Sequence, residues 1–203
     1  MKKILITGFM PFDNASLNPA WEAVKNVPAP EGVELHKKEI SVVFGRAIDE
    51  LLQAVEELRP DAVICVGLAQ GRPAVTPERV AINVNDARIP DNSGACPVDE
   101  PIRADGPAAY FSRLPIKAIV ASINEAGIKA QVSNTAGTYV CNNIMYGLLY
   151  AIEHQYPDMI GGFIHVPAST DMQAEIPEGT PVFELEDITR ALAIAVEETA
   201  MAC

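Results

Sequence analysis

The sequence predicts an α/β fold in which a single domain, spanning residues 1–203, forms a three-layer α/β/α sandwich around a twisted, mostly parallel sheet. Short apolar runs bounded by Gly or Pro alternate with segments of helical period, which is the pattern of parallel strands covered on both faces. With 203 residues, 49% of them hydrophobic, the chain is long enough for one core and too short for two ordinary domains.

The strands are predicted from the apolar runs in chain order. Residues 3–8 carry the run Ile4-Leu5-Ile6, and residues 33–43 begin by alternating apolar and polar side chains. Four further runs are bounded by Gly, Pro or polar residues and also predict strands. They lie at residues 62–68, 80–85, 129–135 and 160–166.

The helices are predicted from apolar side chains three and four positions apart. After Cys141, the residues Ile144, Leu148 and Ile152 mark one buried face in this way. Helices are expected at residues 19–26, 45–58, 115–126, 141–155 and 187–201, with Asp187 as the N-cap of the last. Residues 86–107 are crowded with Pro, Gly and Asp and have no period, so we expect a long loop, and loops of that length are often functional.

The net charge and the cysteine pattern argue against several classes of partner. The 27 acidic and 15 basic residues give a formal net charge of -12, which repels nucleic-acid phosphates and anionic membranes. No charged-then-apolar leader and no apolar stretch of bilayer length is visible, so we expect a cytoplasmic protein without nucleic-acid or membrane partners. The cysteines form no CxxC pair and no cluster with histidine, which predicts reduced thiols and no metal site. They are Cys65, Cys96, Cys141 and Cys203.

Cys141 is the first candidate for chemistry, because it stands where a loop of small residues turns into a helix. Gly137 supplies the backbone freedom for a tight turn from strand to helix. A thiol at the helix start feels unsatisfied N–H groups and the positive end of the helix dipole, and both favour a thiolate. The alternative is a small buried cysteine that only packs.

A cysteine nucleophile needs a base, usually histidine, and the chain has three histidines. His154 lies 13 residues along the same helix as Cys141, which places it roughly 20 Å away. His36 stands among charged residues, where we expect it to be solvated. His165 ends the strand at residues 160–166, and active sites of open α/β sheets lie at the carboxyl ends of strands. We therefore expect His165 to be the base.

The carboxylate that orients the base is left open by composition, because many acidic residues are available. The candidates are Glu78, Asp86 and Asp171. Glu78 lies between a glycine-bearing loop and a strand, so it could be held at the sheet edge. The alternative for Glu78 is a surface ion pair with Arg79.

Four separate stretches resemble the pyroglutamyl peptidase I family of cytosolic cysteine peptidases, also called pyrrolidone carboxyl peptidases. They follow the family's order along nearly the whole chain, at residues 4–12 with 18–24, 71–83, 133–142 and 163–167. The resemblance implies a Cys-His-Glu triad of Cys141, His165 and Glu78. It also implies hydrolysis of the bond after an N-terminal pyroglutamate through a thioester acyl-enzyme, with no metal or organic cofactor, and a homotetramer.

The resemblance also implies binding residues. Arg88 matches the arginine that helps to form the oxyanion hole, together with the backbone N–H of Cys141. The implied pocket for the pyroglutamyl ring has apolar walls and two amides that position the lactam. These residues are Phe9, Phe12, Ile89, Tyr139 and Val140 for the walls, and Asn18 and Gln70 for the amides. Such a pocket suits a neutral lactam and rejects a charged N-terminus, which would lose its hydration there.

One segment departs from the family, and two other functions compete with the peptidase. After Phe12 the family commonly has glycines, whereas this chain has Asp13-Asn14-Ala15-Ser16, so the shape of this loop over the substrate is open. One competing function is a nucleoside-phosphorylase-like ligand-binding module in which residues 67–71 cradle a phosphate, but that loop lacks the known phosphate-binding patterns. The other, an interaction protein without activity, is disfavoured because all three triad residue types are present.

Overall fold

The computed structural model describes residues 1–13 and 15–203, so that Asn14, within the departing segment after Phe12, lies outside the described residues. The central sheet has five strands in the order β2-β1-β3-β7-β4. These are β1 (Lys2–Phe9), β2 (Val33–Ile40), β3 (Ala62–Leu68), β7 (Ile160–Val166) and β4 (Thr76–Pro77). The first four are parallel and β4 runs antiparallel to β7, which confirms the predicted mostly parallel sheet.

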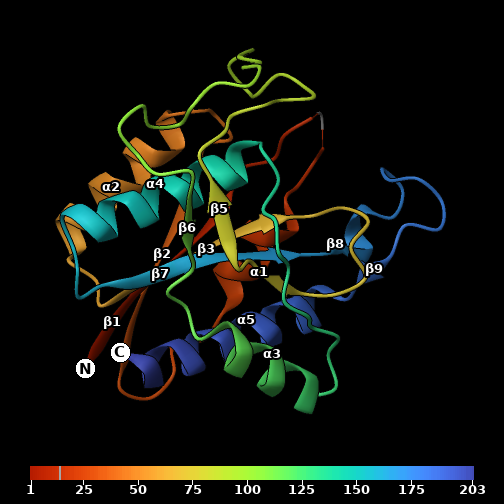
Figure 1. Ribbon diagram of the computed structural model, residues 1–203. Coiled ribbons are helices and arrows are strands. Elements are labelled where there is room, and N and C mark those ends of the chain that lie inside the picture. The colour runs from red at the N-terminus through yellow and green to blue at the C-terminus, as the bar shows by residue number, and fades with distance from the viewer. Residues whose placement is uncertain (14) are drawn as a thin grey trace.

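Helices cover both faces of the sheet (Figure 1). Two lie on one face, α2 (Arg46–Leu58) and α4 (Val140–His154). Three lie on the other face, α1 (Pro19–Asn26), α3 (Ile116–Glu125) and α5 (Leu185–Ala202). Successive side chains of β1 point to opposite faces of the sheet. Ile4 and Ile6 pack with α1 and α5, whereas Leu5 packs with α2 and α4. The predicted α/β/α architecture is confirmed. None of the described helices combines the length and the apolarity that crossing a membrane requires.

Two small sheets lie outside the central one, and one of them shortens a predicted strand. β5 (Val80–Ile82) pairs with β6 (Ala109–Phe111), and β8 (Ala168–Ser169) pairs with β9 (Val182–Phe183), with the 3-10 turn η1 (Thr170–Met172) in between. The strand predicted at residues 80–85 therefore ends at Ile82. Beyond this point the side chain of Asn142 takes the place of a neighbouring strand. It accepts a hydrogen bond from Ile82 N (2.9 Å) and donates one to Val84 O (3.0 Å).

The strand predicted at residues 129–135 is wrong. Within the described part of the chain, this segment makes only isolated bridges with Val75 and Glu78. Pro77 lies between these two partners and has no N–H to donate, so a continuous ladder cannot form.

Two predicted element ends are also wrong. β2 stops at Ile40 because the next N–H, that of Ser41, donates to Glu50 Oε2 (2.8 Å) instead of a neighbouring strand. α5 begins at Leu185 with Glu184 as its N-cap. Asp187 therefore lies in the first turn of α5, where its charge suits the helix dipole but caps nothing.

The fold brings three segments together at the carboxyl ends of β3 and β7. Gly67 of β3 pairs with His165 of β7 in the strand register, and the first turn of α4 packs against the same edge. Residues 86–107 form no helix or strand in the structure, as predicted, and this yellow-green loop stands at the top of Figure 1, above α4. The predicted site residues therefore come from distant parts of the chain.

Candidate active site

Cys141 is the second residue of α4 and lies in its first turn, as predicted. Gly137 turns the chain into this helix with a φ of 78°, an angle that favours glycine. None of the described side chains caps the start of α4, so its first N–H groups are available to a ligand. The thiol lies against β3, because a Cβ placed on Gly67 would come within 3.0 Å of Cys141 Sγ.

His165 and Glu78 form a buried pair at the same edge. The residues Phe163 and His165 are two positions apart on β7, so both side chains face α4. His165 Nδ1 lies 2.7 Å from Glu78 Oε1, and both side chains are buried. Because a carboxylate can only accept, the proton lies on Nδ1 and the lone pair on Nε2. The imidazole is thus arranged to accept a proton at Nε2.

Burial controls the charges of these groups. It lowers the pKa of His165, although the hydrogen bond and the charge of Glu78 raise it. Burial would raise the pKa of Glu78, but the contacts with His165, Ser133 and Arg72, in that order of size, together lower it. Burial, followed by the charge of Glu78, raises the pKa of Cys141 to about 12. The expectation of a thiolate is therefore wrong for the free protein, which holds a neutral thiol, a neutral imidazole and a carboxylate.

Arg72 is a site residue that the sequence analysis missed. Its Nη1 donates to Glu78 Oε1 (2.6 Å). The ion pair considered for Glu78 was with Arg79, but Arg79 Nε donates to Asn134 Oδ1 (2.8 Å) instead. No periodic pattern relates Arg72 to Glu78, because an irregular loop and the short strand β4 separate them. Only the folded chain shows the contact.

The other candidate carboxylates lie elsewhere. Asp86 and Asp171 are exposed, and among the described residues the hydrogen bond of His165 Nδ1 is made with Glu78. Asp86 has a different role, because its N–H donates to Thr138 O (2.9 Å) and its carbonyl accepts from Thr138 Oγ1 (2.7 Å). These bonds tie the long loop to the turn before Cys141. Arg88 follows two residues later and is exposed.

A small pocket lies beside Cys141. Its volume is about 20 Å³, which is room for roughly one water molecule. It is lined by Phe9, Phe12, Asn18, Val42, Leu68, Tyr139, Val140 and Cys141. Five of the seven predicted pocket residues are in this set, whereas Gln70 and Ile89 are exposed and do not line it. Val42 and Leu68 were missed, although their places after β2 and at the end of β3 are a signal that could have found them.

The long loop is anchored beside this pocket by Asp91. The side chain of Asp91 is buried and accepts from the backbone N–H groups of Phe44 (2.9 Å), Ser93 (2.8 Å) and Ala95 (2.9 Å). In addition, the hydroxyl of Tyr139 donates to Pro90 O (3.1 Å). The loop therefore holds one wall of the pocket in place.

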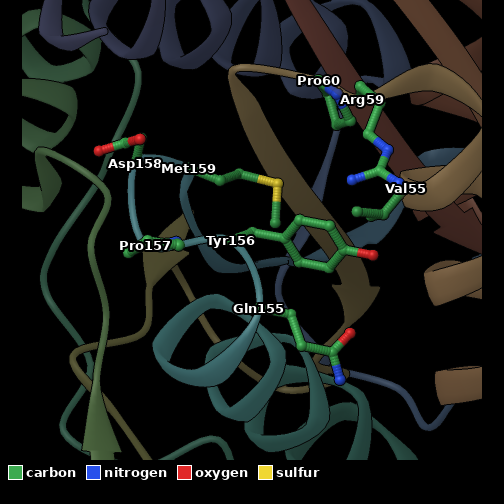
Figure 2. A pocket seen from close by; sticks show the side chains of 8 residues that line it. All are labelled: Val55, Arg59, Pro60, Gln155, Tyr156, Pro157, Asp158 and Met159. Carbon is green, nitrogen blue, oxygen red and sulfur yellow. The ribbon is translucent and has the colours of Figure 1, made fainter.

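A larger cavity lies at the opposite ends of β3 and β7. It has a volume of about 350 Å³, and Figure 2 shows the side chains that line it. They are Val55, Arg59, Pro60, Gln155, Tyr156, Pro157, Asp158 and Met159. Arg59 lies over the ring of Tyr156, 5.5 Å from its centroid. None of the predicted site residues lines this cavity. Among the described residues, no group of three or more His, Cys, Asp or Glu side chains could hold a metal ion.

The phosphate-cradle hypothesis does not fit the loop after β3. The space above Gly67 is filled by Phe163 and Cys141. The N–H of Ala69, in the middle of residues 67–71, donates to Val166 O (2.9 Å). This N–H group is therefore committed within the chain, whereas a phosphate cradle needs it free.

Comparisons with known proteins identify the family of this chain. A family model of pyroglutamyl peptidase matches residues 2–202. A pyrrolidone-carboxylate peptidase of Streptococcus pyogenes serotype M4 is 52% identical over 195 residues, covering 96% of this chain and 90% of that protein. The crystal structure of pyroglutamyl peptidase I of Bacillus amyloliquefaciens matches with a TM-score of 0.95 and 46% identity, covering 99% of this chain and 98% of that chain.

A second solved structure is also similar. The pyrrolidone carboxyl peptidase of Thermococcus litoralis matches with a TM-score of 0.94 and 38% identity, covering 99% of this chain and 94% of that chain. The family match spans nearly the whole chain, and the relatives are matched over nearly their whole length. This chain therefore belongs to the pyroglutamyl peptidase family of cysteine-type peptidases.

Proposed function

We propose that this peptidase hydrolyses the bond after an N-terminal pyroglutamate and releases free pyroglutamate, with Cys141, His165 and Glu78 as its triad. One observation carries the proposal: the buried hydrogen bond of 2.7 Å between His165 Nδ1 and Glu78 Oε1 lies at the sheet edge where the Cys141 thiol also lies. The membership of the family supports the choice of substrate.

The acylation step starts from neutral groups. His165 Nε2 takes the proton of the Cys141 thiol while Sγ attacks the pyroglutamyl carbonyl carbon. Because the pKa of the thiol is raised to about 12, proton transfer accompanies the attack instead of preceding it. Glu78 stabilises the imidazolium that forms. The backbone N–H of Cys141 and the guanidinium of Arg88 receive the oxyanion.

The tetrahedral intermediate formed by this attack then breaks down, and the resulting thioester is hydrolysed. The C–N bond breaks, the leaving amine takes the proton from His165, and the pyroglutamyl group remains on Cys141 as a thioester. A water molecule gives a proton to His165 as it attacks the thioester. The C–S bond breaks, pyroglutamate leaves, and the thiol regains its proton. The reaction needs no metal or organic cofactor.

The pocket beside Cys141 supports selectivity for a lactam. Its walls are mostly aromatic and aliphatic, and no acidic side chain is among its lining residues in the described chain. An ammonium group would enter without a counter-ion and would lose its hydration. At about 20 Å³ the pocket is too small for a five-membered ring, so its walls must move when substrate enters. Phe12, which is only partly buried and whose ring centroid lies 6.3 Å from that of Tyr139, is the side chain placed to do so.

Hydrolysis of a pyroglutamyl chromogenic amide, beside the matching glutamyl and prolyl amides, tests the proposal. We expect turnover of the pyroglutamyl amide alone. Iodoacetamide should abolish the turnover by alkylating the thiol, and 2-pyrrolidone should protect the enzyme against this inactivation. Comparable rates on the glutamyl amide would refute the proposed specificity.

Three variants test the triad. Cys141→Ala and His165→Ala should have no measurable turnover while keeping the wild-type circular dichroism. His154→Ala is the matched control, because His154 is exposed at the far end of α4 and its Nδ1 contacts Tyr150 O. It should keep most of the activity. An active Cys141→Ala protein would exclude Cys141 as the nucleophile.

A further inference from the structure

Arg72 connects three parts of the site. Its Nη1 donates to Glu78 Oε1 (2.6 Å) and to Thr76 Oγ1 (2.7 Å), and its Nη2 donates to Thr135 O (3.0 Å). Thr76 pairs with His165 between β4 and β7. Thr135 belongs to the turn that leads into α4 and Cys141. A single guanidinium therefore bridges the carboxylate, the strand β4 that pairs with the base, and the turn that leads to the thiol.

The carboxylate of Glu78 depends on few partners. Its side chain is completely buried, and both Arg72 Nη1 and His165 Nδ1 bind the same oxygen, Oε1. Among the described residues, Oε2 has no hydrogen-bond partner. The hydroxyl of Ser133 also lowers the pKa of Glu78, although in the structure it donates to Thr135 O (3.0 Å). A buried carboxylate without a cation is costly, and Arg72 is the cation in contact with it.

We propose that Arg72 is a positioning residue of the triad, which holds the ionised Glu78 carboxylate against His165 and ties it to the turn before Cys141. This inference rests on the proposed function. The planar guanidinium suits the role, because its two terminal nitrogens reach three acceptors with a fixed angle between the donors. A lysine ammonium keeps the charge but does not provide this fork.

Arg72 also opposes Glu78 electrostatically at the imidazole. Glu78 raises the pKa of His165 and Arg72 lowers it. The other titratable groups facing this region are the thiols of Cys141 on α4 and Cys65 on β3, and burial raises the pKa of each to about 12. Both are therefore neutral near pH 7. Burial is the largest influence on the pKa of His165, and the opposing charges of one carboxylate and one guanidinium shift that pKa further.

The test is the pH profile of kcat/KM for three variants on the pyroglutamyl chromogenic amide. In Arg72→Gln the hydrogen bond from His165 Nδ1 (2.7 Å) still holds the Glu78 carboxylate, and this bond lowers the pKa of Glu78 more than Arg72 does. Glu78 therefore stays ionised, and loss of the cation should raise the pKa of His165. We expect the acid limb to move to higher pH and kcat to fall by roughly 10- to 100-fold, with little change in KM. Arg72→Lys should restore the position of the acid limb but only part of kcat. Arg79→Gln removes a neighbouring cation that binds Asn134, and it should behave as wild type.

Three results would overturn the inference. They are wild-type kcat in Arg72→Gln, a fall in kcat with an unmoved acid limb, and an equal effect of Arg79→Gln. If Arg72→Gln does not fold, Arg72→Lys tests the inference instead. Full kcat in Arg72→Lys would exclude a role for the planar geometry of the guanidinium donors. The wild-type protein is assayed in parallel: an inactive wild type refutes the proposed function, whereas an active wild type with an unaffected Arg72→Gln refutes the role of Arg72 alone.

Discussion

Replacing Gly67 by alanine tests how closely β3 supports the thiol of Cys141. The new Cβ would lie 2.7 Å from Phe163 Cζ and 3.0 Å from Cys141 Sγ. Phe163 is completely buried, so its ring cannot swing into solvent. Either the ring or the thiol must therefore be displaced.

The cost follows from the two contacts. Overpacking a core lowers the free energy of unfolding by about 1–3 kcal/mol. Alanine has a smaller conformational entropy than glycine in the unfolded chain, which offsets about 0.4–1 kcal/mol of this loss. We therefore expect the free energy of unfolding to fall by about 1–2 kcal/mol. Because a shift of about 1 Å at a reacting group can cost about 100-fold in rate, a smaller shift of Sγ should lower kcat/KM by roughly 10-fold.

Urea denaturation and kinetics on the pyroglutamyl amide measure the two effects separately. Gly147→Ala is the matched control, because its Cβ would come within 2.6 Å of Ile48 Cδ1 between α4 and α2, away from the thiol. It should lose stability through the same overpacking, partly offset by the higher helix propensity of alanine, and keep wild-type kcat/KM. Wild-type kcat/KM in Gly67→Ala, or an equal loss in Gly147→Ala, would refute the reasoning.

Three further predictions concern pH, the long loop and assembly. The acid limb of kcat/KM should have its midpoint below about 6.5, the ordinary value for histidine, because burial lowers the pKa of His165; a midpoint above that value would contradict the assignment. Asp91→Asn should raise KM several-fold with a smaller change in kcat, because it weakens the acceptor that anchors the loop to Phe44 N; an unchanged KM would show that the loop does not shape the pocket. Sedimentation velocity with reductant should give a homotetramer, and monomer mass at all micromolar concentrations would exclude it.

The central strands could be predicted from the sequence because burial on both faces leaves a continuous apolar run. β3 and β7 have the predicted bounds, residues 62–68 and 160–166. α1 also has its predicted bounds, since Asn18 accepts from Ala20 N and Pro19 occupies the first position of the helix. In each case the signal lies within the segment itself.

The failed predictions depend on partners that are distant in sequence. Residues 129–133 would continue the sheet if their partner could pair throughout, but that partner contains Pro77. The side chain of Asn142, about 60 residues away, satisfies the backbone that would have extended β5. Arg72 reaches Thr135 in the same way. No periodicity within a segment reports such contacts.

The charge of Cys141 shows how local and distant effects compete in one residue. The sequence could place the thiol in the first turn of a helix, and that position by itself favours a thiolate. The fold then packs Gly67 against the thiol and brings the negative charge of Glu78 near it, and burial and this charge raise its pKa to about 12. A thiol held neutral in this way can attack only if it loses its proton during the same step. In the proposed mechanism, acylation therefore depends on the neutral imidazole of His165. Burial and the charge of Arg72, which both lower the pKa of His165, would then contribute to the reactivity of the cysteine.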